Sequence, residues 1–328
     1  MDKRIDWIDS ARGIAVLLVI WGHIDGGSIF TRAFYCFHVP LLFWISGFLF
    51  NAEPHKFDLF LIKKIKTIAL PCMLYSTIVI ILGIFIFRDV RYVQLIPQII
   101  MQIKSWPLWY MACLFLLNII GYFVLKRIHK KSMQILIVLL LAGCGLLYNT
   151  FVRVGLPWNM DIAPMAFPFF YFGFLEKDNM KSNKGILIKI NQSAHNSTWI
   201  GFILLLVSIG MGFLNKELSN AFYTFDMYSG HYNIAPISYL SAFIGIYAVC
   251  LMCSRFKSKI LTHVGKRSIV YFAFHFNIFI PMIKSLIGNV ALPNGIQPFL
   301  YFAFTCLMSE MTYYLISKFK YRQYLAVK

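Results

Sequence analysis

The chain of 328 residues contains a series of apolar stretches, each long enough to cross a lipid bilayer. A membrane-spanning helix needs about 20 mainly apolar residues. Hydrophobic residues make up 59% of the sequence and charged residues only 13%, well below the charged share of a soluble domain. We therefore expect an all-α fold, a polytopic integral membrane helical bundle with about ten transmembrane helices, as a single domain over residues 1–328. The stretches are residues 14–30, 34–50, 68–87, 108–125, 135–152, 162–175, 199–214, 234–253, 269–287 and 298–317.

The Lys and Arg residues are unevenly distributed between the two sides of these stretches. All but seven of the 31 fall on the side that carries the N-terminus. Because basic residues gather on the cytoplasmic side of membrane proteins, we expect both termini in the cytoplasm and an even number of spans. The same bias explains the net charge of +18 without a nucleic-acid partner. The seven exceptions are Arg32, Arg88, Arg91, Lys104, Arg153, Lys216 and Lys284.

Neither a cleaved leader nor a metal site is expected. Residues 1–13 alternate in charge, and no small-residue cleavage site follows the first apolar stretch, so that stretch should remain as a helix. The seven cysteines fall within or beside expected spans, where thiols pack as small hydrophobic groups. Cys250 and Cys253 have a metal-binding or redox spacing, but no second pair or nearby histidine completes it. We expect no permanently bound cofactor.

Two ionisable residues, Arg12 and His23, lie on the first apolar stretch. Ionisable groups at membrane depth are costly and usually mark a functional site. Eleven helical steps separate the two side chains by roughly 16 Å, about the reach of an extended pantetheine arm. The alternative is an interfacial arginine that reaches out to the headgroups and a histidine paired with a neighbouring helix.

A second histidine is expected at a similar depth on the next helix. His23 ends the outward path of the first helix, and His38 begins the inward path of the second, across the short loop 25–33. The two could be a general base with its orienting partner, or two metal ligands. The absence of a carboxylate-rich cluster in the sequence favours acid–base chemistry. Pro40 and Gly47 on the second helix indicate a break and a close-approach surface.

A basic run precedes the third expected span, on the same side of the membrane as Arg12. It contains Lys63, Lys64 and Lys66. Such a run usually sets orientation and contacts lipid headgroups. It could also bind the phosphates of a cytosolic donor that contains a nucleotide.

The outer loop 215–233 combines aromatic residues with hydrogen-bonding side chains. Aromatic residues near a membrane interface usually form an anchoring belt. Here they are interleaved with Asp226, His231 and Asn233, which could recognise the hydroxyl groups of a sugar while the rings stack on it. The sequence leaves both interpretations open.

Several stretches together resemble the acyltransferase family 3 of membrane O-acyltransferases. The resemblance covers nearly the whole chain in order, and its most specific motifs lie on the first two expected helices. Two further segments are similar to the fucose 4-O-acetylase-like branch. The family stretches are Arg4–His23, Phe37–Phe48, Phe60–Pro71, Pro107–Phe115 and Gly265–Ser268 leading to His275; the branch segments are Leu156–Asp161 and Phe169–Gly173.

The resemblance implies that an acyl group, commonly acetyl from acetyl-CoA, is transferred to hydroxyl groups of cell-envelope sugars. Arg12 and His23 match the Arg-x10-His motif of the family. The catalytic candidates are therefore His23 and His38, and the donor-binding candidates are Arg12, Lys64 and Lys66. Acceptor-binding candidates are Asp161, Asp226, His231 and Asn233, and further candidates are Trp109 and His275.

The sequence departs from the family pattern in two places. Many members carry Arg where this chain has Lys64 and Lys66, so charge is kept but bidentate phosphate binding is lost. Asn118 stands where a Glu is associated with the branch, so no general acid is expected there. Neither difference affects the motif that contains His23.

We expect a membrane O-acetyltransferase of a bacterial inner membrane, with acetyl-CoA as co-substrate and a glycan or lipid-linked sugar as acceptor, surrounded by membrane lipids. His23 could act as a general base or carry the acetyl group itself. The main alternative is a transporter or flippase of lipid-linked glycans without acyl transfer. The sequence has no internal repeat of the kind many transporters show, and its ionisable groups concentrate on the first two expected helices, which favours the enzyme.

Overall fold

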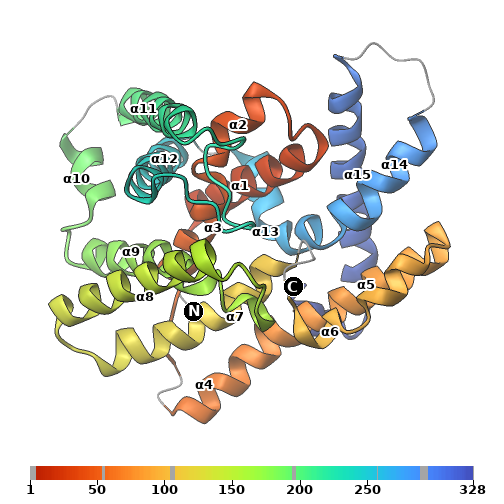
Figure 1. Cartoon of the computed structure of the whole chain (residues 1–328), viewed down its shortest axis with the longest axis horizontal. Coiled ribbons are helices and arrows are strands. Elements are labelled where there is room, and N and C mark those ends of the chain that lie inside the picture. The colour runs from red at the N-terminus through yellow and green to blue at the C-terminus, as the bar shows by residue number, and fades with distance from the viewer. Residues whose placement is uncertain are drawn as a thin grey trace.

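The computed structural model describes residues 5–53, 56–103, 108–193, 197–256, 258–288 and 295–327. Arg4, Lys104 and Pro107, which belong to the sequence patterns above, lie outside the described residues. Within the described ranges the regular structure is helical, apart from an isolated bridge between Asp226 and His231. Figure 1 shows the helices as one bundle. The expected all-α membrane fold is confirmed.

The structure contains ten helices of eleven or more residues in its described part, joined by shorter helical segments. The longer helices are α1 (Asp6–Ile24), α3 (His38–Phe48), α5 (Leu70–Phe87), α7 (Trp109–Gly121), α8 (Lys131–Phe151), α9 (Ala163–Lys181), α11 (Ser197–Leu218), α12 (Ala235–Arg255), α13 (Lys259–Phe274) and α15 (Gln297–Ser317). The short α-helices are α2 (Ile29–Tyr35), α4 (Phe57–Lys64), α6 (Gln98–Met101), α10 (Ile186–Ser193) and α14 (Ile280–Ile287). Segments η1 (Ile65–Ala69), η3 (Tyr122–Arg127) and η5 (His275–Phe279) are π-helical, and η2 (Val90–Leu95), η4 (Pro157–Asn159) and η6 (Arg322–Leu325) are 3₁₀-helical.

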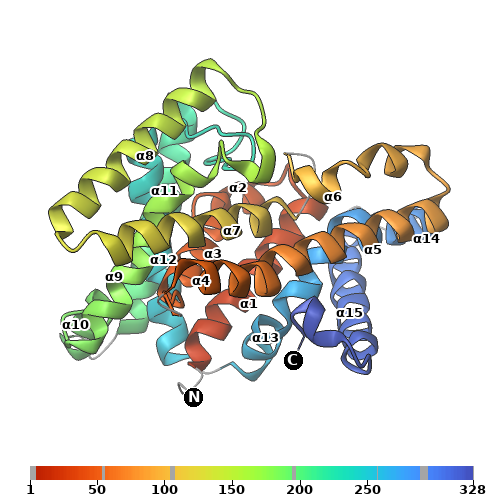
Figure 2. The ribbon, with the colours of Figure 1, turned by 90° about the horizontal axis from the view of Figure 1, so that it is seen from below.

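Nine helical segments of the described chain are long and apolar enough to cross a membrane, one fewer than the ten expected. The expected span that is not among the nine, 162–175, is part of α9. The last turns of α9 are charged, with Glu176 and Lys181, and lower its mean hydropathy. The apolar part of α9 is buried against α3 and α8. Figure 2 shows the start of α1 and the end of α15 at the same end of the bundle, as an even number of crossings would place them.

The first helical hairpin differs in detail from the expected spans. α1 begins at Asp6, so Arg12 lies inside the helix and not at its entrance. The expected span 34–50 is divided into α2 and α3 by a turn at residues 36–37. Pro40 lies in the first turn of α3, where a backbone N–H has no helical partner to lose. The proline therefore marks the start of a helix and does not kink it, and His38 becomes the first residue of α3.

Helices near the centre of the bundle differ sharply in burial from those at its edges. The spans that contain α1, α3, α12 and α13 are more than half buried, whereas those of α11 and α15 are 22% and 17% buried. Figure 1 places α1, α3 and α13 in the middle and α11 and α15 on opposite sides. In the described part of the chain, the outer helices leave large apolar side chains exposed, as is expected of faces that contact lipid.

Reciprocal glycines bring two pairs of central helices into backbone contact. A Cβ on Gly13 of α1 would collide with the carbonyl of Leu261 in α13, and one on Gly265 would collide with the carbonyl of Asp9. Gly47 and Gly173 do the same for α3 and α9, against the carbonyls of Phe170 and Trp44. Small residues allow this close packing where no hydrophobic effect drives helices together in lipid. The close-approach surface expected at Gly47 is present.

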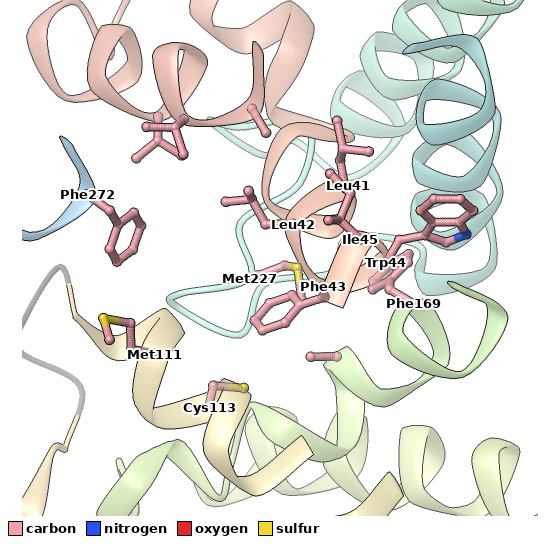
Figure 3. Close-up of a cluster of buried hydrophobic side chains, with 14 of the residues drawn as sticks. Leu41, Leu42, Phe43, Trp44, Ile45, Met111, Cys113, Phe169, Met227 and Phe272 are labelled. Carbon is pink, nitrogen blue, oxygen red and sulfur yellow. The ribbon is translucent and has the colours of Figure 1, made fainter. Parts of the chain in front are cut away.

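α3 is buried on several sides at once, which fixes the direction of each of its side chains. Trp44 points toward α12, where its ring lies 6.0 Å from that of Tyr247, and Phe43 lies 4.8 Å from the ring of Tyr110 on α7. Figure 3 shows these opposite directions, with Leu42 facing the space toward which Phe272 of α13 projects. α3 therefore holds Leu42 and His38 on the wall of the site described next.

Candidate active site

A cavity of about 430 Å³ lies between the end of α1, the start of α3 and the loop before α12, and we call it the outer cavity. α1 contributes His23 near its last residue, and α3 contributes His38 as its first. The remaining wall is mostly aromatic and apolar. The lining residues are Val19, Gly22, His23, Gly26, Tyr35, His38, Val39, Pro40, Leu42, Trp109, Tyr110, Tyr223, Phe225, Asp226, Met227, Tyr228, Phe272 and Phe276.

The His23 side chain lines this cavity and is flanked by two rings. Its ring centroid lies 4.6 Å from that of Phe276 and 5.1 Å from that of His275. An imidazole held by rings and exposed to a cavity can exchange protons with a bound molecule. The structure therefore places His23 where a reacting group can meet it.

His38 lies on the same wall in a fixed orientation. Its Nδ1 is 3.0 Å from the carbonyl oxygen of Phe34, so Nδ1–H is the donor and Nε2 is left as an acceptor. The ring is buried and packs against Tyr35 and Phe34, with centroids 4.8 and 5.3 Å away. The two histidines expected at similar depth therefore do share one cavity.

A third histidine, His275, lies behind His23. It begins the π-helical segment η5, and π-helical turns occur often at functional sites. Its Nδ1 lies 3.0 and 2.9 Å from the carbonyl oxygens of Tyr271 and Phe272, which assigns the proton to Nδ1. Its Nε2 is buried without a hydrogen-bond partner in the described structure, and its ring contacts that of His23. Among the histidines named from the sequence, His275 therefore has the ring nearest to His23. The sequence had predicted His38 as the partner of His23.

The loop between α11 and α12 closes the outer side of the cavity with aromatic rings and one carboxylate. Tyr223 stacks on Tyr35 at 4.5 Å, and Tyr228 lies 5.8 Å from Trp109. Burial and then the nearby Asp226 carboxylate raise the pKa of Tyr228, which keeps its phenol a neutral donor. The Asp226 carboxylate accepts hydrogen bonds from the backbone N–H and the hydroxyl of Ser229. These side chains offer ring faces and polar groups of the kind that bind sugars.

His231 and Asn233 lie beyond this cavity, on a neighbouring surface depression of about 580 Å³ that also includes Tyr223 and Asp226. His231 pairs with Asp226 through backbone hydrogen bonds of 3.1 and 2.9 Å. The Asn233 amide donates to the carbonyls of Tyr223 and Thr224 at 3.1 and 3.0 Å, so it holds the loop in shape. Asp226 is thus the residue of the predicted acceptor trio that reaches the outer cavity.

Asp161, the fourth predicted acceptor residue, is buried away from both of these surfaces. Its Oδ1 accepts a hydrogen bond of 3.2 Å from the backbone N–H of Leu156, and its carbonyl accepts one of 2.7 Å from Asn149. These contacts join the loop before α9 to α8. The structure therefore places Asp161 as a support for the loop.

A second, smaller cavity of about 190 Å³ lies nearer the start of α1, and we call it the inner cavity. Its polar groups are the Arg12 guanidinium and the hydroxyls of Ser46, Thr67, Tyr110 and Ser268. Arg12 and His23 face these two cavities from one side of α1, since eleven residues make just over three full turns. The lining residues are Arg12, Val16, Leu42, Ser46, Thr67, Ile68, Tyr110, Met111, Leu114, Ser268, Ile269 and Phe272.

The three predicted donor-binding cations are not equivalent. Arg12 lines the inner cavity, where it lies 3.3 Å from the carboxylate of Asp9. Lys64 lies one helical turn before Ile68 of the cavity wall, with its ammonium 5.2 and 5.6 Å from the ring centroids of Phe60 and Phe50. Lys66 is exposed. Neither lysine lines the inner cavity, although both precede Thr67 and Ile68, which do.

Other residues singled out by the sequence take no part in either cavity. Asn118 is buried and donates to the carbonyl of Leu114, one turn earlier on α7. Cys250 and Cys253 are buried free thiols on α12. In the described part of the chain no group of three potential metal ligands comes together.

Sequence reasoning missed the aromatic residues that shape both cavities, above all Tyr110 and Phe272. Aromatic residues are common on every span, so their composition carried no special signal. Tyr110 lies in a stretch that resembles the family, and Phe272 lies three residues before His275. Those positions were the available clues.

Taken together, the bundle and its two cavities have the form of a group-transfer site within a membrane protein, with a cation at one end and imidazoles at the other. The chain belongs to the acyltransferase 3 family, because it matches the model of that family, described as an acyltransferase domain, over residues 5–311. It is therefore a membrane acyltransferase. Comparisons with curated proteins and with solved structures gave no match.

Proposed function

We propose that the protein is an O-acetyltransferase that moves an acetyl group from acetyl-CoA, bound from the side of Arg12, to a sugar hydroxyl in the outer cavity. The observation that carries this proposal is the placement of Arg12 and His23 on one face of α1, each lining its own cavity. Their separation of roughly 16 Å along the helix is about the reach of a pantetheine arm. A donor held by its phosphates near Arg12 would bring its thioester to His23.

In the reaction, the acceptor hydroxyl gives its proton to the His23 imidazole as its oxygen attacks the thioester carbonyl carbon. A C–O bond forms and the C–S bond breaks. The CoA thiolate leaves and takes the proton back from His23, so acids and bases balance without another reactant. His38 would orient the hydroxyl through its free Nε2, and His275 would hold the His23 ring. In the variant with an acetyl-His23 intermediate, a C–N bond to the imidazole forms as the C–S bond breaks. The acceptor oxygen then attacks the acetyl carbon, so that the C–O bond forms, the C–N bond breaks and the hydroxyl proton passes to the CoA thiolate.

The lysines outside the inner cavity would attract the nucleotide part of the donor. Lys64 and Lys66 add positive charge beside Thr67 and Ile68 of the cavity wall, and phosphates pair well with such cations. Arg12 would contact the donor more deeply, next to the pantetheine arm. The three cations would thus act in sequence along one path.

The acceptor would lie against the rings at the outer end, with its hydroxyl toward His23. Trp109 and Tyr228 offer ring faces, and the Asp226 carboxylate could accept hydrogen bonds from sugar hydroxyls. An envelope glycan or a lipid-linked sugar at the outer leaflet of a bacterial inner membrane fits this placement, in keeping with the resemblance to the fucose 4-O-acetylase-like branch.

The direct test uses proteoliposomes that enclose a glycan extract of the source cells, with radiolabelled acetyl-CoA added at the Arg12 side. We expect label in the glycan with the wild-type protein and none with His23→Ala. Movement of glycan across the membrane without transfer of label would support the flippase alternative and contradict the proposal.

A further inference from the structure

The outer and inner cavities are separated by side chains that belong to the walls of both. Among the described residues, Leu42, Tyr110 and Phe272 line both cavities. They come from α3, α7 and α13, three different helices. The shared residues lie between residues that line one cavity and residues that line the other. On α3, for example, Val39 before Leu42 lines the outer cavity, and Ser46 after it lines the inner one.

The shared residues contact one another across the path between Arg12 and His23. The rings of Tyr110 and Phe272 meet edge to face, with centroids 5.4 Å apart. The Tyr110 hydroxyl lies 2.9 Å from the Ser46 hydroxyl and 3.1 Å from the carbonyl oxygen of Leu42. Figure 3 shows Phe272 projecting from α13 toward Leu42 on α3. The hydrogen bonds tie the Tyr110 ring to α3 and complete the barrier.

The Tyr110 hydroxyl can leave its hydrogen bonds without leaving the Leu42 carbonyl of α3 unsatisfied. The Ser46 hydroxyl also reaches the Leu42 carbonyl, at 2.8 Å. If the Tyr110 ring swings away, Ser46 can still donate to that carbonyl, so no buried acceptor on α3 is left unsatisfied. The phenol would move into a cavity with space for it, since Tyr110 borders open volume on both sides.

We propose that Leu42, Tyr110 and Phe272 form a septum that the pantetheine arm must part to bring its thioester to His23. The proposal rests on the function proposed above, because it assumes that the donor enters at Arg12. A septum closed before the donor binds keeps water from passing between the two sides and from hydrolysing the thioester. Tyr110 and Phe272 are thus positioning residues for the donor, with no part in the bond changes.

The test compares two thioesters that should reach His23 by different routes. Acetyl-CoA cannot cross a membrane, so when it is added outside vesicles with the Arg12 end outward, it must pass the septum. S-acetyl-N-acetylcysteamine is small and uncharged, crosses the membrane and can enter the outer cavity directly. The rate of free-thiol release is measured for both donors, with a glycan extract of the source cells enclosed as acceptor.

Phe272→Trp adds bulk to the septum, and Phe274→Trp makes the same change at a buried position of α13 outside both cavities. Phe272→Trp should lower the rate of thiol release from acetyl-CoA by about tenfold or more, because misplacement of a reacting group commonly has an effect of this size. The rate with the small thioester should stay within about twofold of wild type. Phe274→Trp should not separate the two donors. Equal effects of Phe272→Trp on both donors, or no effect on either, would overturn the septum.

A second variant keeps the proposal testable if the larger ring prevents folding. Phe272→Ala should join the cavities and raise acetyl-CoA hydrolysis in empty vesicles several-fold over Phe274→Ala. Unchanged hydrolysis in a well-folded Phe272→Ala protein would contradict the septum. If the wild-type protein releases thiol from neither donor, the proposed function itself fails, which is a different outcome from loss of donor discrimination.

Discussion

The two cavities differ in size, in charge and in the chemistry of their walls. The inner cavity, of about 190 Å³, is lined by a guanidinium and the hydroxyl groups of four residues among apolar side chains. The outer cavity, of about 430 Å³, carries two imidazoles, several aromatic rings and a carboxylate at its edge. α1 lines both cavities, with Arg12 in the wall of the inner one and His23 in the wall of the outer one. The difference supports our proposal that donor binding and acyl transfer occupy different turns of one helix.

The comparison predicts that removing the imidazole of His23 has the largest effect on activity. His23→Ala should lower acyl transfer by at least about 100-fold, the usual contribution of a general base. Membrane abundance should stay near wild type, because the ring faces a cavity. Transfer is measured at matched protein abundance, with His129→Ala as the control, since His129 is an exposed histidine outside both cavities. Activity within a few-fold of wild type would remove His23 from its assigned role.

The next effect concerns the inner cavity and should fall on the donor alone. Arg12→Ala should raise the KM for acetyl-CoA by about tenfold, because a charge-assisted hydrogen bond to phosphate is lost. The KM for the acceptor should stay unchanged. Arg12→Lys should recover part of the loss, since it keeps the charge without the planar fork. An equal rise in both KM values would indicate a structural role for Arg12.

The outer cavity should show the opposite pattern. Asp226→Asn should raise the KM for the glycan by about fivefold, the cost of one weakened hydrogen bond. Acetyl-CoA binding, measured by calorimetry in detergent, should not change. Asp58→Asn, at an exposed carboxylate on α4, is the matched control. If glycan acetylation in cells is indifferent to Asp226→Asn, the loop serves as an interfacial anchor.

The smallest effect is expected at the two lysines that do not line the inner cavity. The double variant Lys64→Ala with Lys66→Ala should raise the KM for acetyl-CoA by about two- to threefold at low ionic strength, and the difference should vanish in high salt. Lys64→Arg should be tolerated. A loss larger than that of Arg12→Ala, or one that persists in high salt, would place the lysines in direct contact with the donor.

The sequence was sufficient to predict the helical membrane fold and the first helix of the site. Apolar stretches report spans directly, because every backbone polar group in lipid must be paired within a helix. Arg12 and His23 stood out since charged and titratable residues are rare at that depth. The mean hydropathy of α9 is too low for a membrane span because its last turns are charged, although its apolar part is buried.

Tertiary contacts decided the roles that spacing could not. Lys64 and Lys66, like Arg12, were predicted to bind the donor because they are basic residues on the same side of the membrane. Their positions on α4 and η1 place them outside the cavity that Arg12 lines. Asp161 and Asp226 are both carboxylates in loops, and only the folded chain shows that one supports a loop while the other reaches the outer cavity. Tyr110 and Phe272 became visible as a pair only when α7 and α13 came together.

The most direct test of the central claim is mass spectrometry of envelope glycans from cells with the wild-type gene, without it, and with His23→Ala at equal protein abundance. We predict that a glycan carries the added mass of one acetyl group only with the wild-type protein. Identical glycan masses in all three strains, or an acetylated glycan that persists with His23→Ala, would contradict acetyl transfer at His23.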